Sequence, residues 1–356
     1  MSQSYALTEA GLKIRNSRNV RAREFVCFKS INPLAQALSD CIVTGPGLIP
    51  GISAAGMCLQ AQTYAATSTP ETFYYTLQEA VLALKAARNY SLPMSRTVTA
   101  ISRLISDLVS RQASPQTCCK ALLSLHDALC AAIDKDESEL RRSIEATLPP
   151  TGSIVSVGGF GSQHSVAQGT LVPVLIKLKK AAKFVPFVYS PTAAPLTETY
   201  YSIEQLQAAG CPCELVTDAS LPSQMLRQSV NAVYVMAVRV CANGDVVCPA
   251  GSTGAVAVAK LLGVPVYAIA YRHCFDSTYV AGSEVPVEEY VRPELGDKPS
   301  VAVRQPFVNF LPHDWITSFV TGEGLIAPSE SERLKAFTDT AQTALLSALE
   351  PCCRLA

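Results

Sequence analysis

Hydrophobic and polar residues follow two different periods along the chain, and the change falls near residue 150. Across residues 31–148, apolar side chains recur three and four positions apart. This spacing places them on one face of an α-helix. It predicts helices at residues 76–90, 94–112, 114–133 and 136–148. The first 150 residues are therefore predicted to form a helical domain.

After Pro149-Pro150-Thr151-Gly152, short apolar stretches alternate with helical segments. Strands are predicted at residues 153–157, 184–189, 213–216, 232–238, 264–270 and 308–310, and helices are predicted to begin near Ser165, Thr199, Leu221 and Thr253. Such alternation is typical of an α/β fold with a doubly wound, Rossmann-like parallel sheet, whose sites lie at the carboxyl ends of the strands. Residues 151–356 are predicted to form this second domain, with a long loop at residues 275–306.

Residues 231–270 form a predicted βαβ unit with a glycine-rich helix start at Gly251-Ser-Thr-Gly254. The backbone N–H groups at such a start favour an anion, and the turn after the first strand offers a similar arrangement. Both turns also have an interpretation that needs no ligand, as tight connections between strand and helix. The candidate ligand pocket comprises Gly158, Gly159, Gly161, Asn243, Asp245, Gly251, Ser252 and Lys260.

Composition narrows the classes of partner. Lys plus Arg and Asp plus Glu both number 29, so a basic surface for nucleic acid is not expected. Charged residues make up only 16% and hydrophobic residues 49%, which predicts apolar surface covered by partner subunits. The chain has no apolar run long enough to span a bilayer and begins with a polar segment. It is therefore predicted to be cytoplasmic, with no membrane partner.

The 13 cysteines do not form paired CxxC motifs, and the four histidines are dispersed. No metal is predicted, and the thiols are expected to be reduced. Gly159 and Gly161 supply only two glycines of a dinucleotide fingerprint, so no nicotinamide or other cofactor is expected. Catalysis by a Cys/His pair stays open, because nothing in the sequence orients a particular pair.

Four segments in the same order resemble one family, which contains the regulatory subunits of eukaryotic initiation factor 2B and the sugar-1-phosphate aldose–ketose isomerases. They lie at residues 34–61, 84–105, 185–221 and 312–331. The third is similar to the family's strand, turn, helix and Thr-Asp-Ala turn, and the fourth to its closing Glu-x-Gly-x-Ile-x-Pro-Ser segment. Among the regulatory subunits, the resemblance is greatest to delta, then to beta or alpha.

In the isomerase branch, the resemblance implies a cysteine after the first sheet strand and an aspartate before the Asn-Gly-Asp turn, acting as acid and base. Here those positions fall in Gly158-Gly-Phe-Gly161 and at Val238. An aliphatic side chain cannot transfer a proton. The lysine of the family's phosphate pocket is also replaced, within residues 248–252. These differences predict that the pocket is vestigial and that catalysis is lost.

The main hypothesis is therefore a non-catalytic regulatory subunit of the guanine nucleotide exchange factor for initiation factor 2. The resemblance implies sister subunits as partners and contact with the phosphorylated alpha subunit of initiation factor 2. The candidate partner-sensing surface comprises Arg88, Asn89, Ser91, Met94, Ser95 and Arg96. One alternative is a phosphosugar-binding protein or an aldose–ketose isomerase that acts on a sugar 1-phosphate. Another is a structural homo-oligomer.

Overall fold

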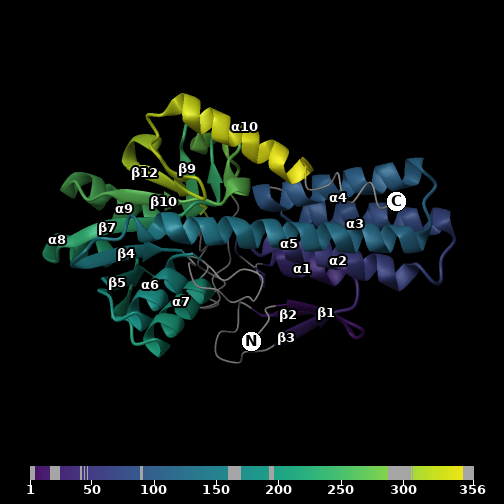
Figure 1. The fold of residues 1–356 in the computed structure, drawn as a ribbon, viewed down its shortest axis with the longest axis horizontal. Coiled ribbons are helices and arrows are strands. Elements are labelled where there is room, and N and C mark those ends of the chain that lie inside the picture. Colours follow the sequence, from purple (N-terminus) through teal and green to yellow (C-terminus); the bar gives the residue numbers. More distant parts are fainter. Residues whose placement is uncertain are drawn as a thin grey trace, which may run out of the picture.

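Helices gather in one half of the molecule and a large sheet lies in the other, as the computed structural model of the chain shows (Figure 1). The structure describes residues 5–16, 25–40, 42–43, 45, 47–88, 91–158, 170–191, 196–287, 306 and 308–347. The helical half contains α1 (Ile31–Ser39), α2 (Ile49–Tyr64), α3 (Pro70–Ala87), α4 (Leu92–Ser110) and α5 (Pro115–Glu145). Thr69 and Ser114 cap the starts of helices α3 and α5. Their hydroxyls accept the backbone N–H groups of Thr72 and Thr117.

One long helix, α5, replaces the two helices predicted at residues 114–133 and 136–148. It runs without a break for 31 residues. The residues between the two predicted segments, Asp134 and Lys135, neither remove a backbone donor nor force a turn, and no proline or glycine lies between Gln116 and Glu145. The prediction of two helices was therefore wrong at this point.

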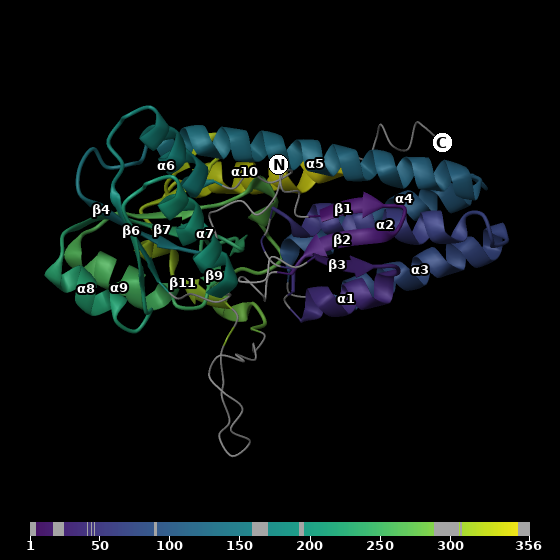
Figure 2. The same ribbon diagram turned by 90° about the horizontal axis from the view of Figure 1, so that it is seen from below.

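A small antiparallel sheet precedes the helices and was not predicted. It contains β1 (Tyr5–Thr8), β2 (Gly11–Arg15) and β3 (Phe25–Phe28), and it lies alongside α1 and α2 (Figure 2). Gly11 has a φ of 127°, and a Cβ there would lie 2.5 Å from the carbonyl oxygen of Phe28. The turn between β1 and β2 therefore requires glycine.

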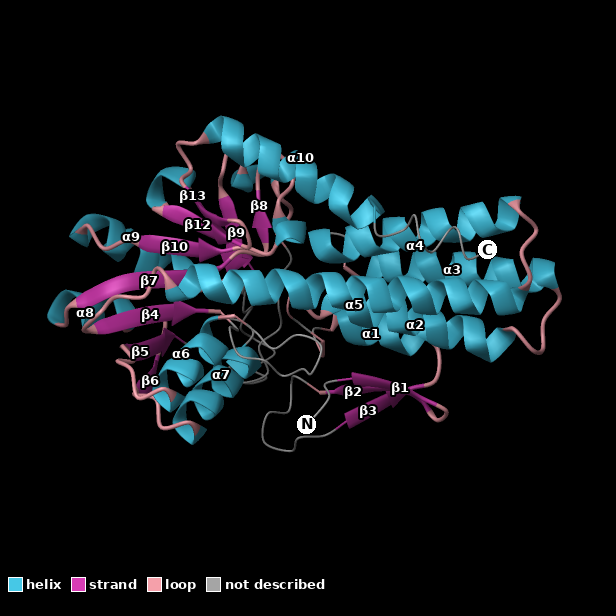
Figure 3. Ribbon diagram, in the orientation of Figure 1, coloured by secondary structure: helices cyan, strands magenta, loops and turns pink. Residues whose placement is uncertain are grey.

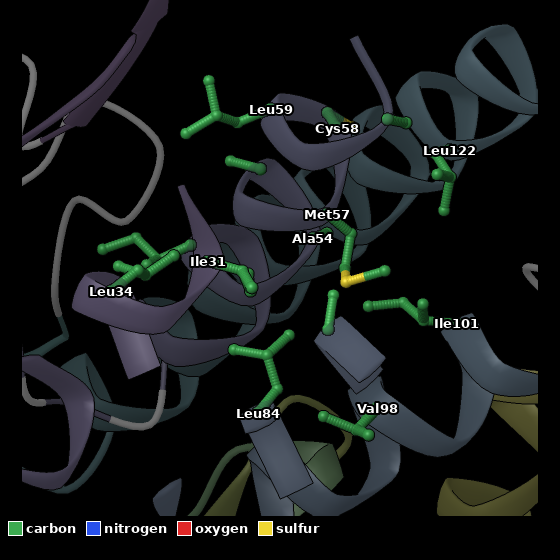
Figure 4. Close-up of a cluster of buried hydrophobic side chains, with 14 of the residues drawn as sticks. Ile31, Leu34, Ala54, Met57, Cys58, Leu59, Leu84, Val98, Ile101 and Leu122 are labelled. Atoms are coloured by element: carbon green, nitrogen blue, oxygen red, sulfur yellow. The ribbon is translucent and has the colours of Figure 1, made fainter. Parts of the chain in front are cut away.

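The core of the helical half is built from side chains of all five helices (Figure 4). Met57 of α2 is fully buried there and lies among Ile101, Val98 and Leu84. Helix α2 is buried over most of its length because α4, α5 and the small sheet all pack around it. Gly56 allows this close packing, since a Cβ at this position would lie 2.4 Å from Leu34 Cδ2 and 2.9 Å from Ile31 Cδ1.

Gly56→Ala is expected to destabilise the protein by about 1–2 kcal/mol. Overpacking a core typically costs about 1–3 kcal/mol, and the better helix propensity of alanine returns up to about 1 kcal/mol. The change is measured by urea denaturation. Gly254→Ala lies at an exposed position in helix α9 (Ser252–Leu262) and serves as control, because it gains helix propensity without meeting a buried core. Equal effects at both positions would contradict the packing argument.

The second half contains a seven-stranded sheet in the order β13-β12-β10-β7-β4-β5-β6, parallel except for β13 (Figure 3). Its strands are β4 (Ser153–Val157), β5 (Phe187–Pro191), β6 (Cys213–Val216), β7 (Val230–Met236), β10 (Val266–Ile269), β12 (Ser318–Thr321) and β13 (Gly324–Ile326). At the centre, Val155 pairs with Tyr189 on one side and Val233 on the other, and the register between β4 and β7 shifts between Ser153 and Ile154.

Helices cover both faces of this sheet. Leu140 and Ile144 of α5 pack with α6 (Leu171–Lys180) and α7 (Leu196–Ala208) on one face. On the other face lie α8 (Leu221–Arg227), α9 (Ser252–Leu262) and α10 (Ser331–Ser347). The predicted doubly wound α/β fold is confirmed. The helix expected near Ser165 begins at Leu171, and Ser165 itself lies outside the described residues.

The predicted strand at residues 308–310 is correct but belongs to a separate sheet. That sheet has the order β11-β9-β8 and contains β8 (Arg239–Val240), β9 (Val246–Pro249) and β11 (Val308–Leu311). Within the described part of the predicted loop 275–306, the regular structure is a single helical turn at Gly282–Glu284. None of the helices described has both the length and the apolar character needed to cross a membrane. The domain boundary at residue 150 stays a prediction.

Candidate functional site

The carboxyl ends of the parallel strands point toward the helical half (Figure 3). Gly158 follows β4 directly and has a φ of 114°, which strongly favours glycine. A Cβ there would lie 2.8 Å from Met236 Cβ and 3.5 Å from Pro249 Cγ. The absence of a side chain thus lets the end of β4 pack closely against the ends of β7 and β9.

Helix α9 begins at this same place. Gly251 precedes the helix with a φ of 98°, and the hydroxyl of the buried Ser252 donates to the carbonyl oxygen of Pro249 at 2.6 Å. Pro249 therefore links the end of β4 to the start of α9. Three of the eight predicted pocket residues, Gly158, Gly251 and Ser252, come together at this edge.

Asn243 and Asp245 lie apart from this group, at the tip of the hairpin between β8 and β9. The side-chain oxygen of Asn243 accepts the N–H of Asp245 at 2.9 Å. The Asp245 carboxylate then accepts the backbone N–H groups of Gly282 at 3.0 Å and His313 at 2.9 Å, and it lies 3.1 Å from the His313 ring nitrogen. Asp245 consequently connects the tip of this hairpin with the loops that contain Gly282 and His313, and its hydrogen bonds lie there and not at Gly158.

The pKa of Asp245 reflects this role. Burial alone would raise the pKa, but the hydrogen bonds at Asn243, Gly282 and His313 outweigh it and hold the pKa below its ordinary value. The ionised carboxylate is thus the form that the loops require.

Lys260 lies in the last turn of α9 and is exposed. Its ammonium group donates to the carbonyl oxygen of Asp314. Eight residues separate it from the helix start, which is about 12 Å along the axis. It is therefore not brought into the group around Pro249. Gly159 and Gly161 lie outside the described residues.

The side chain of Val238 is aliphatic and cannot transfer a proton, as the sequence indicated. Its N–H donates to the carbonyl oxygen of Val247 at 2.8 Å, and its side chain packs against a small apolar cluster with Cys241, Val247 and Val308.

Most described residues of the candidate partner-sensing surface are not exposed to solvent. Arg88, Ser91 and Met94 are all buried, Arg96 is partly buried and Ser95 is exposed. Arg88 donates to the carbonyl oxygen of Val43 at 3.3 Å. Asn89 lies outside the described residues. Met94 packs into the core of the helical half, while Arg96 reaches the second half of the molecule and donates to the carbonyl oxygen of His273.

Sequence reasoning missed the segment after β10, residues 271–276, which the helical half holds through several hydrogen bonds. Tyr271 donates its hydroxyl to Glu137 Oε1 at 2.6 Å, and Asp136 accepts the backbone N–H of Arg272 at 2.7 Å. Arg96 of α4 donates to the carbonyl oxygens of His273 and Phe275. The sequence did carry a signal, because Asp136 and Glu137 occupy the face of α5 on which apolar residues were expected.

A buried ion pair lies at the end of this segment. Arg239 directly follows Val238 in the chain. Its guanidinium donates to Asp276 and stacks 4.9 Å from the ring centre of Tyr279. Burial lowers the pKa of Arg96, and the Asp276 carboxylate opposes that effect. Arg96, Arg239 and Asp276 thus form a cluster of two cations and one anion. Their combined charge favours an added anion at this edge of the sheet.

Asp136→Asn is expected to remove a pH dependence of stability. Burial raises the pKa of Asp136 from 3.8 to about 6, despite the hydrogen bond from Arg272. A raised carboxyl pKa means that the folded protein binds the proton more tightly, so the wild-type loses stability as the pH rises from about 4 to about 6. The difference corresponds to about 3 kcal/mol, which the asparagine variant does not lose.

Urea denaturation between pH 4 and pH 7 measures this difference for the wild-type and the variant. Glu79→Gln, at an exposed position on α3, is the control and is expected to keep the wild-type profile. A variant profile as steep as that of the wild-type would show that another group carries the dependence.

No group of three or more His, Cys, Asp or Glu side chains suited to a metal ion occurs in the part of the chain that the structure describes.

Known proteins resemble this chain over nearly its whole length. The methylthioribose-1-phosphate isomerase of Heliobacterium modesticaldum is 25% identical over 317 residues, which cover 86% of this chain and 90% of the relative. The 5-deoxyribose 1-phosphate isomerase of Moorella thermoacetica is 25% identical over 320 residues, covering 86% and 88%. Other relatives carry the same kind of name.

Two solved structures share the fold. The 5-methylthioribose 1-phosphate isomerase of Pyrococcus horikoshii has a TM-score of 0.80 at 21% identity, covering 96% of each chain. Subunit delta of the translation initiation factor eIF-2B from A. fulgidus has a TM-score of 0.75 at 20% identity, covering 95% of this chain and all of that one. At these identities the likeness concerns the fold.

These relatives correct the main functional hypothesis. They are named as isomerases, so the prediction of a non-catalytic regulatory subunit in translation initiation was wrong, and so was the expectation that the chain is not an enzyme. The prediction that its partners are sister subunits and the phosphorylated alpha subunit of initiation factor 2 was therefore also wrong. The resemblance to delta rested on short motifs, whereas the similarity to the named isomerases extends over 86% of this chain.

The wider family assignment is confirmed. The model of the initiation factor 2 subunit family matches residues 49–328, which extend from the start of α2 to beyond the last strand of the sheet. The match includes most of the helical half and the whole carboxyl edge described above. The chain therefore belongs to the initiation factor 2 subunit family.

Proposed function

We propose that this chain binds a pentose 1-phosphate and interconverts its aldose and ketose forms. The observation that carries the proposal is the similarity to sugar-1-phosphate isomerases over 86% of this chain and 88–90% of the relatives. A match of this extent includes both halves of the molecule. It therefore supports a shared type of ligand at the edge where the two halves meet.

The charge and backbone geometry of this edge suit a phosphate. The start of α9, with Gly251 in front of it, offers backbone N–H groups and the positive end of a helix dipole. Arg96 and Arg239 lie at this edge together with the carboxylate of Asp276, and the two arginines supply positive charge for a phosphate. Gly158 adds no side chain that would obstruct a ligand beside Pro249.

The reaction also requires a group that accepts and returns a proton. Neither Gly158 nor Val238 supplies one. Among the described residues, the proton-carrying side chains beside the end of β10 include Asp136, Glu137 and Tyr271. Burial raises the pKa of Asp136 to about 6, which brings this carboxyl group closer to neutrality than its ordinary value of 3.8. Asparagine at this position therefore tests activity as well as stability.

The test uses the purified full chain with methylthioribose 1-phosphate and 5-deoxyribose 1-phosphate. Formation of the ketose is followed by NMR, and binding is followed by thermal unfolding. A ligand at a hundredfold excess over its dissociation constant stabilises the protein by about 2.7 kcal/mol. Stabilisation together with turnover supports the proposal. Stabilisation without turnover reduces it to phosphosugar binding, and the absence of both overturns it.

A matched pair of glycine variants locates the site. Gly158→Ala introduces a Cβ 2.8 Å from Met236 and is expected to abolish ligand stabilisation. Gly263→Ala also places alanine at a positive φ, 68°, at the far end of α9, with no atom within 4 Å of the new Cβ, and is expected to leave ligand stabilisation intact. An equal loss in both variants would remove the assignment to the carboxyl edge.

A further inference from the structure

A second group of reactive side chains lies in the helical half. The Cys130 sulfur lies 3.6 Å from His126 Nε2, and His126 Nδ1 lies 2.9 Å from Asp127 Oδ1. The Tyr5 hydroxyl contacts both, at 3.0 Å from His126 Nε2 and 3.3 Å from the Cys130 sulfur. These four residues, here called the thiol cluster, come from β1 and α5.

The fold builds the thiol cluster from local helix geometry and one distant strand. His126 and Cys130 are four residues apart on α5, so their side chains emerge on the same face of the helix. Tyr5 reaches this face from β1, and its ring meets the imidazole edge to face, with centroids 6.0 Å apart. Gly51 of α2 makes room, because a Cβ there would lie 2.6 Å from the Tyr5 hydroxyl and 3.5 Å from the Cys130 sulfur.

Proton positions in the thiol cluster follow from its partners. The exposed Asp127 carboxylate accepts the Nδ1 proton of His126, which leaves the Nε2 lone pair free to accept a proton from the other side. Cys130 thus provides a nucleophile, His126 a base and Asp127 a group that orients the base, and each lies within hydrogen-bonding distance of the next. This is the geometry by which a neutral thiol is activated.

We propose that Cys130 is a nucleophilic thiol, activated by His126, and a modification site for soft electrophiles such as α,β-unsaturated carbonyl compounds. The sulfur forms a bond to the β-carbon of the electrophile. The thiol proton passes to His126 Nε2, either directly or through the Tyr5 hydroxyl. It then passes to the α-carbon, so that nothing leaves and no oxidant is required. The proposal is independent of the sugar-phosphate function.

Base assistance is needed because burial raises the pKa of the Cys130 thiol. Without His126, little thiolate would be present near neutral pH. Access to the site is open, since Cys130 is only partly buried, the His126 side chain is 18% exposed and Asp127 is 69% exposed. Cys58 and Cys118 are buried in the core and are not expected to react at a comparable rate.

Cys27 provides an internal control. It is exposed on β3, and its thiol donates to the carbonyl oxygen of Ala10 at 3.4 Å. It should therefore react as an ordinary surface thiol. Trypsin separates the two cysteines into the peptides 121–135 and 24–29, each of which contains a single cysteine.

The test is the rate of alkylation of the folded full chain by N-ethylmaleimide at pH 7, followed by peptide mass spectrometry. His126→Ala is expected to slow the reaction of Cys130 by at least about tenfold, at the low end of general-base effects, while Cys27 keeps its rate. Free imidazole added to this variant is expected to restore part of the Cys130 rate and none at Cys27. A purely structural His126 would not show this rescue.

Asp127→Asn gives a second measurement that does not depend on the folding of the alanine variant. The residue is exposed, and asparagine keeps its shape while losing the charge that orients the imidazole. Cys130 is expected to react several times more slowly in this variant, with Cys27 unchanged. An unreactive Cys130 in the wild-type chain, or an equal rate in the wild-type and both variants, would overturn the proposal.

Discussion

Asp276→Asn is expected to destabilise the protein by about 3–5 kcal/mol. The Arg239 and Asp276 side chains are only 5% and 3% exposed, so water cannot replace the lost partner of the arginine. Asparagine can still accept from Thr278 through the oxygen that now does so, but its amide then faces a guanidinium. Arg96 lies near enough to repel Arg239 once the carboxylate is gone. Urea denaturation at pH 7 measures the loss.

Two controls separate burial from charge alone. Lys177→Met breaks an exposed pair with Glu145 and is expected to cost no more than about 1 kcal/mol. In the double variant Arg239→Gln with Asp276→Asn, both charges are absent, so part of the stability should return. An Asp276→Asn effect as small as that of Lys177→Met would show that the pair is more hydrated than its geometry indicates.

Phe275→Ala is expected to cost about 3–5 kcal/mol, the range for removing a fully buried aromatic side chain. The Phe275 ring is completely buried and packs against Phe337 and Phe319, with centroids 4.6 Å and 6.0 Å away. Its backbone carbonyl also accepts from Arg96. Loss of the ring would leave a cavity below the segment that the helical half holds, so sugar-phosphate binding should weaken together with stability.

Phe310→Ala is the matched control because it removes the same side chain from a position that is 40% exposed. Its loss of stability should be clearly smaller, and ligand binding should be retained. Thermal and urea unfolding of both variants give the comparison. Equal losses at the two positions would contradict the view that Phe275 is the centre of this packing.

Periodicity predicted much of the fold correctly because the signals were long. The runs that became α3, α4 and the central strands β4 and β7 each carry enough apolar residues to define a face or a buried core. The small N-terminal sheet was missed because β1 and β3 have only four residues each and lie outside the strand–helix alternation that marked the equally short β6.

The candidate site was predicted less well, for reasons of topology. Asp245 is close to Gly251 in sequence, yet the hairpin of β8 and β9 carries it away from the start of α9. Arg96 and His273 are 177 positions apart in the chain and meet only in the folded molecule. A single sequence does not show such encounters, and of the predicted pocket residues that the structure describes, Gly158, Gly251 and Ser252 lie together.

The functional prediction failed for a different reason. It gave decisive weight to the absence of a proton-carrying group at Val238 and in the turn after β4. Val238 carries no proton-transferring group in the structure either, but the similarity to isomerases extends far beyond this position. A reaction can be supported by other side chains at the same edge, and the variants at Asp136 address that question directly.

The continuous helix α5 has a consequence for how the molecule unfolds. At 31 residues it is about 46 Å long, and its first part packs into the core of the helices while Leu140 and Ile144 pack against the sheet. Neither core can open without exposing apolar surface on the same rigid rod. The two halves are therefore expected to lose their structure together, in one cooperative transition, despite having separate cores.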